Sequence, residues 1–289
     1  MTVLIIGGIG FLGTELVRRA AAAGTEAAAT FATTRPGTIP GVTWRALDVR
    51  DPAQVAGVIS EVSASVVINA SSGGADWEVT AEGSIHIAMA AARLGVRLVH
   101  VSSDAVFSGA GVHYAESCLP DPVTPYGAAK AAAETAVRLL VPSAVIASTS
   151  LIIGHGRSVH ERTVHAHVAG TREGVLFTDD VRCPVHVEDL AAALWEVAVS
   201  DAAGVLHLAG PDALSRHDLG RLIAQRDGLD ATRLPAGRRA DAPLPGALDV
   251  RLDGRATQER LGTRIRGARE FPRGDGRVVV DSRTLPRPL

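Results

Sequence analysis

The first thirteen residues constrain the fold of this chain more than any other stretch. The apolar run Val3–Ile6 leads directly into a segment in which Gly7, Gly10 and Gly13 are spaced three residues apart. A helix-period apolar pattern then continues to about residue 23. In a strand, glycine turn and helix start of this kind, backbone N–H groups and the helix dipole face a diphosphate. The N-terminus therefore predicts a dinucleotide-binding element, although its first spacing differs from G-x-G-x-x-G.

Apolar runs and helix-period segments alternate along the first half of the chain. Beyond the first strand we expect strands at residues 26–31, 43–47, 66–69, 97–102 and 144–153, and helices at 77–94 and 124–140. Alternation at this spacing implies a parallel, doubly wound sheet with right-handed crossovers. The fold class expected is therefore α/β, a Rossmann-type sheet with a smaller C-terminal substrate-binding lobe.

The character of the sequence changes after Gly154, where His and Arg become frequent. We expect residues 1–153 to form the nucleotide-binding Rossmann domain. Residues 154–270 are expected to form a smaller substrate-binding lobe, interleaved with the first domain. Residues 271–289 are rich in Gly, Pro and Arg, and a segment with so little to bury is expected to be a mobile tail.

Charge and cysteine content exclude several classes of partner. A net charge of −2 gives no electrostatic reason to expect nucleic acid or an anionic membrane surface. Two cysteines, Cys118 and Cys183, are too few for a disulfide framework or a zinc site, and His165-x-His167 has no third ligand at motif spacing. We therefore expect no metal. With no signal peptide and no long apolar run, a cytoplasmic location is expected.

One tyrosine and one lysine point to chemistry. Lys130 is the only lysine in the chain, and it follows Tyr126, one of two tyrosines, by four residues. On the expected helix these residues share a face, with Cβ atoms about 5–6 Å apart. An ammonium that close would favour the phenolate and lower the pKa of Tyr126 from its ordinary value of about 10. The pair predicts a general acid–base site, the alternative being a surface helix with a chance Tyr and Lys.

The residues after the second and third strands bear on the choice of cofactor. A carboxylate after the second strand would bind a ribose 2′-hydroxyl and repel a 2′-phosphate. None is present there, and Thr33 and Arg35 suit a phosphate, so NADPH is favoured over NADH. Asp48 follows the third strand, where it either accepts a hydrogen bond from an adenine amine or caps the turn before Asp51.

These residues together resemble the extended short-chain dehydrogenase/reductases and, within them, the dTDP-4-dehydrorhamnose reductase (sugar nucleotide-binding) family. The resemblance covers roughly residues 1–270. It depends on the glycine pattern, Asn69-Ala70, the stretch Leu98–Phe107, Tyr126-x-x-x-Lys130, Pro184–Leu190 and Leu252-Asp253.

The resemblance implies reduction of a ketone by hydride from a nicotinamide. Tyr126 would protonate the nascent alkoxide, and Lys130 would lower the pKa of Tyr126 and bind the nicotinamide ribose. Ser103 would hydrogen-bond the carbonyl, while Ser102 ends the strand; an exchange of roles between these two serines stays open.

The sequence pattern and the resemblance also supply candidate contacts. The candidate cofactor contacts are Gly7, Gly8, Ile9, Gly10, Phe11, Leu12, Gly13, Thr33, Arg35, Asp48, Val49, Asn69, Ala70, Ser71, Tyr126, Lys130 and Ser150. The candidate substrate contacts are Ser72, Asp104, Ala105, Val106 and Phe107. For Asp104, capping of a turn is an equal alternative.

Three positions depart from the family pattern. Thr80 stands where the family has an asparagine, Ser148 where it has an arginine, and Ala105 where an aromatic residue is usual. Related sugar-nucleotide dehydratases carry a catalytic glutamate after Asp104, so Ala105 also excludes dehydration chemistry. Together the departures indicate an altered substrate pocket beside an intact cofactor site.

Two further functions remain as alternatives. The same catalytic residues could reduce a non-nucleotide ketone or an imine in a biosynthetic pathway. Alternatively, the chain could be a non-catalytic NADP-binding subunit that resembles the regulatory β subunit of methionine adenosyltransferase. The small-molecule ketone is the expected partner, and the sequence leaves the oligomeric state open, a homodimer included.

Overall fold

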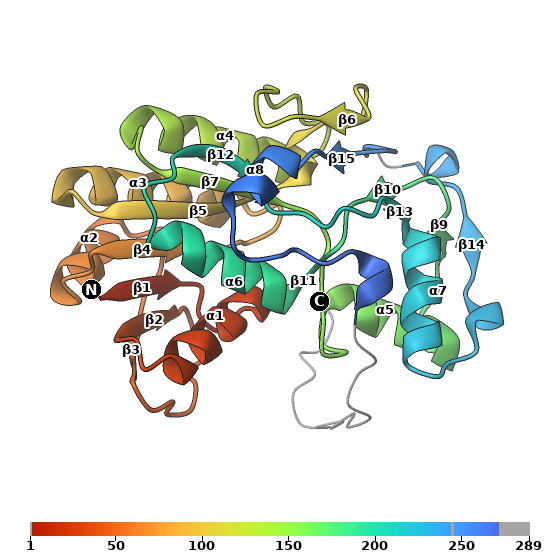
Figure 1. The fold of residues 1–289 in the computed structure, drawn as a ribbon, viewed down its shortest axis with the longest axis horizontal. Coiled ribbons are helices and arrows are strands. Elements are labelled where there is room, and N and C mark those ends of the chain that lie inside the picture. Colours follow the sequence, from red (N-terminus) through yellow and green to blue (C-terminus); the bar gives the residue numbers. More distant parts are fainter. Residues whose placement is uncertain (1, 244–245, 272–289) are drawn as a thin grey trace.

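A computed structural model gives the structure of residues 2–243 and 246–271 (Figure 1). Its centre is a seven-stranded parallel sheet in the order β12-β7-β5-β4-β1-β2-β3. The strands are β1 (Val3–Ile6), β2 (Ala27–Phe31), β3 (Val42–Ala46), β4 (Val66–Asn69), β5 (Arg97–Ser103), β7 (Val145–Thr149) and β12 (Gly204–His207). The predicted fold class, a Rossmann-type doubly wound sheet, is confirmed.

Helices cover both faces of this sheet. One face packs against α2 (Pro52–Glu61), α3 (Gly83–Leu94) and α4 (Pro125–Leu140), and the other against α1 (Phe11–Ala22) and α6 (Val187–Ala198). Because both faces are covered, the strands are continuous apolar runs, and all four residues of β1 are buried. The core is built from Ala, Val, Leu and Ile, as the aromatic content of 3% requires.

The smaller lobe lies beyond the carboxyl ends of β5 and β7, at the right of Figure 1. Its two helices, α5 (Val159–Ala169) and α7 (Arg216–Arg226), share an apolar cluster. Short strand pairs connect it: β8 (Ile152–Ile153) with β11 (Val185–His186), β10 (Val181–Arg182) with β13 (Leu214–Ser215), and β9 (Leu176–Phe177) with β14 (Ala236–Gly237). Residues 187–207 return to the sheet as α6 and β12, so the chain passes between the two parts more than once.

Several boundaries differ from those expected. The strand expected at 144–153 is broken, because the chain leaves β7 after Thr149 and pairs again as β8 with β11. The helix expected at 77–94 opens with a π-helical turn, Glu78–Glu82, before α3. The remaining elements include β6 (His113–Tyr114), which pairs with β15 (Arg251–Leu252), and α8 (Arg255–Arg260).

The C-terminal tail expected at 271–289 lies outside the described residues, apart from Phe271. Among the helices that the structure describes, none is both long enough and apolar enough to cross a membrane.

Candidate active site

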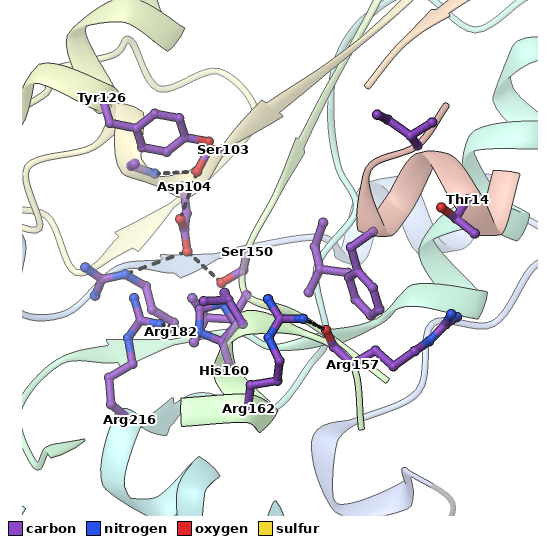
Figure 2. A pocket seen from close by; sticks show the side chains of 16 residues that line it. Thr14, Ser103, Asp104, Tyr126, Ser150, Arg157, His160, Arg162, Arg182 and Arg216 are labelled. Carbon is purple, nitrogen blue, oxygen red and sulfur yellow. Dashed lines mark hydrogen bonds and ion pairs between the residues drawn. The ribbon is translucent and has the colours of Figure 1, made fainter. Parts of the chain in front are cut away.

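A cavity of about 690 Å³ lies where the carboxyl ends of the central strands meet the smaller lobe (Figure 2). One wall comes from the sheet side and the other from the lobe. The sheet-side wall contains Ile9, Phe11, Thr14, Ser103, Asp104, Ala105 and Tyr126. The lobe-side wall contains Ser150, Leu151, Ile152, Arg157, Val159, His160, Arg162, Arg182 and Arg216.

The glycine loop between β1 and α1 borders the sheet-side wall. Gly7 has a φ of +84°, and a Cβ on it would lie 2.9 Å from the backbone of Ser71. A Cβ on Gly13 would lie 2.0 Å from the Gly7 carbonyl oxygen. Gly10, in extended conformation, precedes α1 with no side-chain cap, so N–H groups of the first turn remain available. This geometry fits the diphosphate of a dinucleotide.

The adenosine end of the expected cofactor site shows one free cation and one occupied carboxylate. Arg35 is exposed, and no hydrogen bond or ion pair engages its side chain within the part of the chain that the structure describes. Asp48 binds Arg50 through the backbone N–H at 3.0 Å and Nη2 at 2.6 Å. This matches the turn-capping alternative for Asp48; its contact with adenine stays a prediction. Val49 packs inward against Gly83.

Buried polar groups hold the loop of residues 70–74, which follows β4. Asn69 Oδ1 accepts hydrogen bonds from Ser71 N at 3.1 Å and Ser71 Oγ at 2.6 Å. Thr80 Oγ1 accepts from Gly73 N at 3.0 Å and donates to Gly74 O at 2.9 Å. The threonine that departs from the family pattern therefore orders the loop, a role that the sequence analysis did not identify.

Ser103 and Tyr126 meet at the cavity, as the sequence predicted. Ser103 is the last residue of β5, and its Oγ accepts a hydrogen bond from Ala105 N at 3.2 Å. Thr124 caps α4 by accepting from Gly127 N at 3.1 Å, which places Tyr126 in the first turn. The Tyr126 phenol lies beside Ser103 (Figure 2), and it hydrogen-bonds the side chains of Ser103 and Ser72. Two hydroxyl groups can therefore bind one carbonyl oxygen.

The expected effect of Lys130 on the pKa of Tyr126 is wrong. Burial raises the pKa of the Tyr126 phenol above 10.0, and the nearby Asp104 carboxylate raises it as well, although hydrogen bonds from Ser103 and Ser72 oppose them. Lys130 is not among the groups that shift the pKa of Tyr126, and its Nζ instead donates to Val101 O at 3.0 Å. Burial lowers the pKa of Lys130 itself to about 8. The i,i+4 spacing gave the correct face of the helix but not the direction of the amine.

Asp104 is more than a turn cap. Its Oδ2 accepts from Ser150 Oγ at 2.6 Å and lies 3.7 Å from Arg182 Nε, while its Oδ1 accepts from Ser103 Oγ at 3.3 Å. Ser150 also accepts from Cys183 N at 3.2 Å. Ser150, expected to contact the cofactor, thus supports the carboxylate at the base of the cavity.

Three expected substrate contacts, Ser72, Val106 and Phe107, do not line the cavity. Val106 and Phe107 are 0% and 3% exposed and belong to an apolar cluster under the β6 loop. The ring of Phe107 stacks on that of Tyr114 at a centroid distance of 4.1 Å. Both residues therefore pack the loop, because the chain turns into a 3₁₀ segment directly after Ser103.

Four arginines of the smaller lobe give the cavity a positive wall that the sequence analysis missed (Figure 2). Arg182 is buried and binds Asp180 at 3.0 Å, and Arg216 binds the same carboxylate at 3.3 Å and His160 Nδ1 at 3.3 Å. Arg157 and Arg162 are exposed. Burial, reinforced by Arg216, lowers the pKa of His160 to about 4. Guanidinium groups in this arrangement suit phosphate or carboxylate groups.

Comparison with known proteins gives consistent results. The family model for the RmlD substrate binding domain matches residues 1–270. The chain is 31% identical over 259 residues to dTDP-4-dehydrorhamnose reductase of Mycobacterium tuberculosis, covering 84% of this chain and 81% of that protein. It is 27% identical over 243 residues to the spore coat polysaccharide biosynthesis protein SpsK of Bacillus subtilis, covering 80% and 81%.

A solved structure extends the comparison to the fold. The structure of dTDP-4-dehydrorhamnose reductase from Bacillus anthracis in complex with NADP has a TM-score of 0.77 to this chain at 20% identity. The match covers 93% of this chain and 96% of that one.

Proposed function

The chain belongs to the RmlD substrate binding domain family, and on this premise we propose that it is an NADPH-dependent reductase of a ketone on a nucleotide-linked 6-deoxy sugar, as in dTDP-4-dehydrorhamnose reductase. The observation that carries the proposal is the shared cavity. Ser103 and Tyr126 stand between a glycine loop suited to a dinucleotide and a wall of arginines suited to a second diphosphate.

The chemistry follows from the two hydroxyl groups. The nicotinamide, when bound, supplies a hydride to the carbonyl carbon. Ser103 and Tyr126 bind the carbonyl oxygen, and Tyr126 donates its proton as negative charge develops there. The raised pKa of Tyr126 keeps the phenol protonated at neutral pH, which is the state that a proton donor requires.

The preference for NADPH rests on the end of β2. The residues after this strand include no carboxylate that would repel a 2′-phosphate, and the exposed Arg35 is available to bind one. The relative from Bacillus anthracis was solved with NADP. At Gly7 and Gly13 a Cβ would collide with neighbouring backbone, so glycine keeps this loop compact. A loop of this kind would bring its backbone N–H groups close to the pyrophosphate.

The substrate class rests on the lobe-side arginines. A neutral ketone has no use for Arg157, Arg162 and Arg216 around one cavity, whereas the diphosphate of a nucleotide sugar matches planar guanidinium groups. Ala105 leaves open the alternative of a non-nucleotide ketone or imine, because it removes a large side chain from the site. The cytoplasmic location and the oligomeric state stay predictions.

The test is a turnover assay with matched substrates. Purified protein is incubated with NADPH and dTDP-4-dehydrorhamnose, with the same keto sugar without its nucleotide, and with a panel of small ketones and imines. Loss of NADPH absorbance with the nucleotide-linked ketone alone supports the proposal. Turnover of a small ketone or imine alone favours the second enzyme class. NADPH binding without turnover of any compound would contradict an enzyme and favour a regulatory subunit.

A further inference from the structure

The buried face of α4 carries two ionisable side chains one helical turn apart, Lys130 and Glu134. Their exposed fractions are 3% and 2%. Each contacts a consecutive residue of β5: Lys130 Nζ donates to Val101 O at 3.0 Å, and Ser102 Oγ donates to Glu134 Oε1 at 2.5 Å. The next residue on that strand is Ser103. This pair therefore lies directly behind the hydroxyl groups of the proposed active site.

Hydroxyl groups hold the Glu134 carboxylate in place. Besides Ser102, the Ser148 Oγ donates to Oε1 at 3.5 Å, and the half-exposed Arg138 lies 4.0 Å from Oε2. Burial raises the pKa of Glu134 above its ordinary value, and the hydrogen bonds from Ser102 and Ser148 and the charge of Arg138 only partly oppose this rise. Hydrogen bonds donated to a carboxylate favour its charged form. The hydroxyl groups and Arg138 therefore favour the ionised carboxylate, while burial disfavours it.

His100 is the other titratable side chain that faces Lys130, and it cannot supply negative charge. The Ser71 N–H donates to Asn69 Oδ1, so Asn69 Nδ2 must be the donor to His100 Nδ1, at 3.2 Å. The proton of neutral His100 is therefore on Nε2, a buried atom with no partner among the described residues. Burial and the charge of Lys130 both lower the pKa of His100. His100 therefore offers the amine of Lys130 neither a negative charge nor a free acceptor nitrogen.

We propose that Glu134 is a positioning residue whose carboxylate keeps the buried amine of Lys130 protonated. Burial alone disfavours an ammonium, and of the acidic groups that the structure describes, Glu134 is the one that opposes this effect at Lys130. During turnover the charged amine would bind the hydroxyl groups of the nicotinamide ribose more strongly than a neutral amine would. That consequence rests on the reductase function proposed above, whereas the protonation of Lys130 does not.

The experiment uses the fact that Lys130 is the only lysine in the chain. Protein produced with isotope-labelled lysine gives one lysine side-chain signal by NMR, so the amine can be titrated directly. Glu134→Gln keeps an oxygen that accepts from Ser102 but removes the charge. We expect the wild-type amine to titrate near 8 and the Gln variant at least about one pH unit lower. Glu61→Gln, on the exposed end of α2, is the matched control and leaves the titration unchanged.

Two additional measurements keep the outcome decisive. If Glu134→Gln does not fold by circular dichroism, Ser102→Ala replaces it: loss of the hydroxyl raises the pKa of Glu134 and shifts the Lys130 titration down by a smaller amount. An unchanged Lys130 titration in a folded variant overturns the proposal.

The second measurement is the pH–rate profile of NADPH oxidation. We expect the alkaline limb of the Glu134→Gln profile to move to lower pH, as the pKa of the Lys130 amine does. If the Lys130 titration shifts but the alkaline limb of the pH–rate profile does not, the role of the charged amine in turnover is overturned. If the wild-type protein is inactive, the reductase function is contradicted, and the NMR titration still decides whether Glu134 keeps Lys130 protonated.

Discussion

The two walls of the cavity are built in different ways. The sheet-side wall comes from short stretches at strand ends and helix starts: the glycine loop before α1, Ser103 at the end of β5 and Tyr126 at the start of α4. The lobe-side wall contains arginines from α5 and the turn before it, from α7 and from a two-residue strand, separated by up to about sixty residues of chain. The sheet side is fixed by local backbone geometry, and the lobe side by tertiary contacts. We expect the sheet side to determine the reaction and the cofactor, and the lobe side to determine which ketone is reduced.

The largest effect should come from the sheet side, at the proton donor. Tyr126→Phe removes only the phenol hydroxyl, so turnover should fall by about 10²–10⁴-fold, the usual contribution of general acid catalysis. NADPH affinity should remain near that of the wild type. Steady-state rates and a fluorescence titration measure the two quantities, and a variant with half of the wild-type rate would refute the assignment.

The next effect tests the glycine loop. A Cβ at Gly13 would lie 2.0 Å from the Gly7 carbonyl oxygen, so Gly13→Ala must displace backbone. We expect a loss of about 1–3 kcal/mol in the free energy of unfolding, together with weaker NADPH binding. Gly24→Ala is the control for steric crowding, because a Cβ there meets no atom within 4 Å. Its φ of +62° makes alanine unfavourable through backbone strain alone. Equal NADPH affinity in Gly13→Ala and wild type would contradict the role of the loop.

On the lobe-side wall we expect a smaller effect, on the KM for the ketone substrate. Arg162 is exposed in the cavity, so its loss should leave folding intact and remove a charge-assisted contact to a diphosphate. Arg162→Ala should raise KM for the nucleotide-linked ketone by about tenfold, with little change in kcat or NADPH affinity. If KM for a nucleotide-free ketone rises equally, Arg162 does not recognise the diphosphate, and the lobe-side wall does not select the ketone in the way we expect.

On the sheet side, Arg35 is the exposed residue expected to determine the choice between NADPH and NADH. Arg35→Ala should weaken NADPH binding by several-fold, within the range of a single exposed charge contact, and leave NADH binding unchanged. Parallel titrations with both cofactors in the same variant provide the control. An equal loss for both would show that Arg35 does not contact the 2′-phosphate.

The smallest expected effect is a dependence of folding stability on pH, caused by His160 in the smaller lobe. The pKa of His160 is lowered to about 4 from 6.5, so the unfolded chain takes up a proton at a pH where the folded lobe does not. Stability should therefore fall as the pH falls from about 6.5 to about 4. His160→Gln should flatten the dependence of Tm on pH in this window. An unchanged slope would show that His160 does not contribute to it.

The sequence was sufficient for the sheet and for Ser103 and Tyr126, because periodicity, glycine spacing and helix register are local properties. It was insufficient where a side chain had a choice of partner. Lys130 turns to a β5 carbonyl instead of the phenol, and Phe107 stacks on Tyr114 instead of entering the cavity. The arginine wall left no local pattern, because arginine supplies nearly every positive charge in this chain. Only the folded lobe distinguishes Arg182 and Arg216 from the rest.

The repeated passage of the chain between sheet and lobe limits how this enzyme can be re-engineered. A truncation after residue 153 would remove α6 and β12, leaving the edge of β7 unpaired and α1 as the one remaining helix of the two on its face of the sheet. The nucleotide-binding half is therefore not a module that can be cut out or fused at one end. A chimera that takes the smaller lobe of a relative needs matched junctions near residues 150, 187 and 208, and again near residue 250, where β15 pairs with β6.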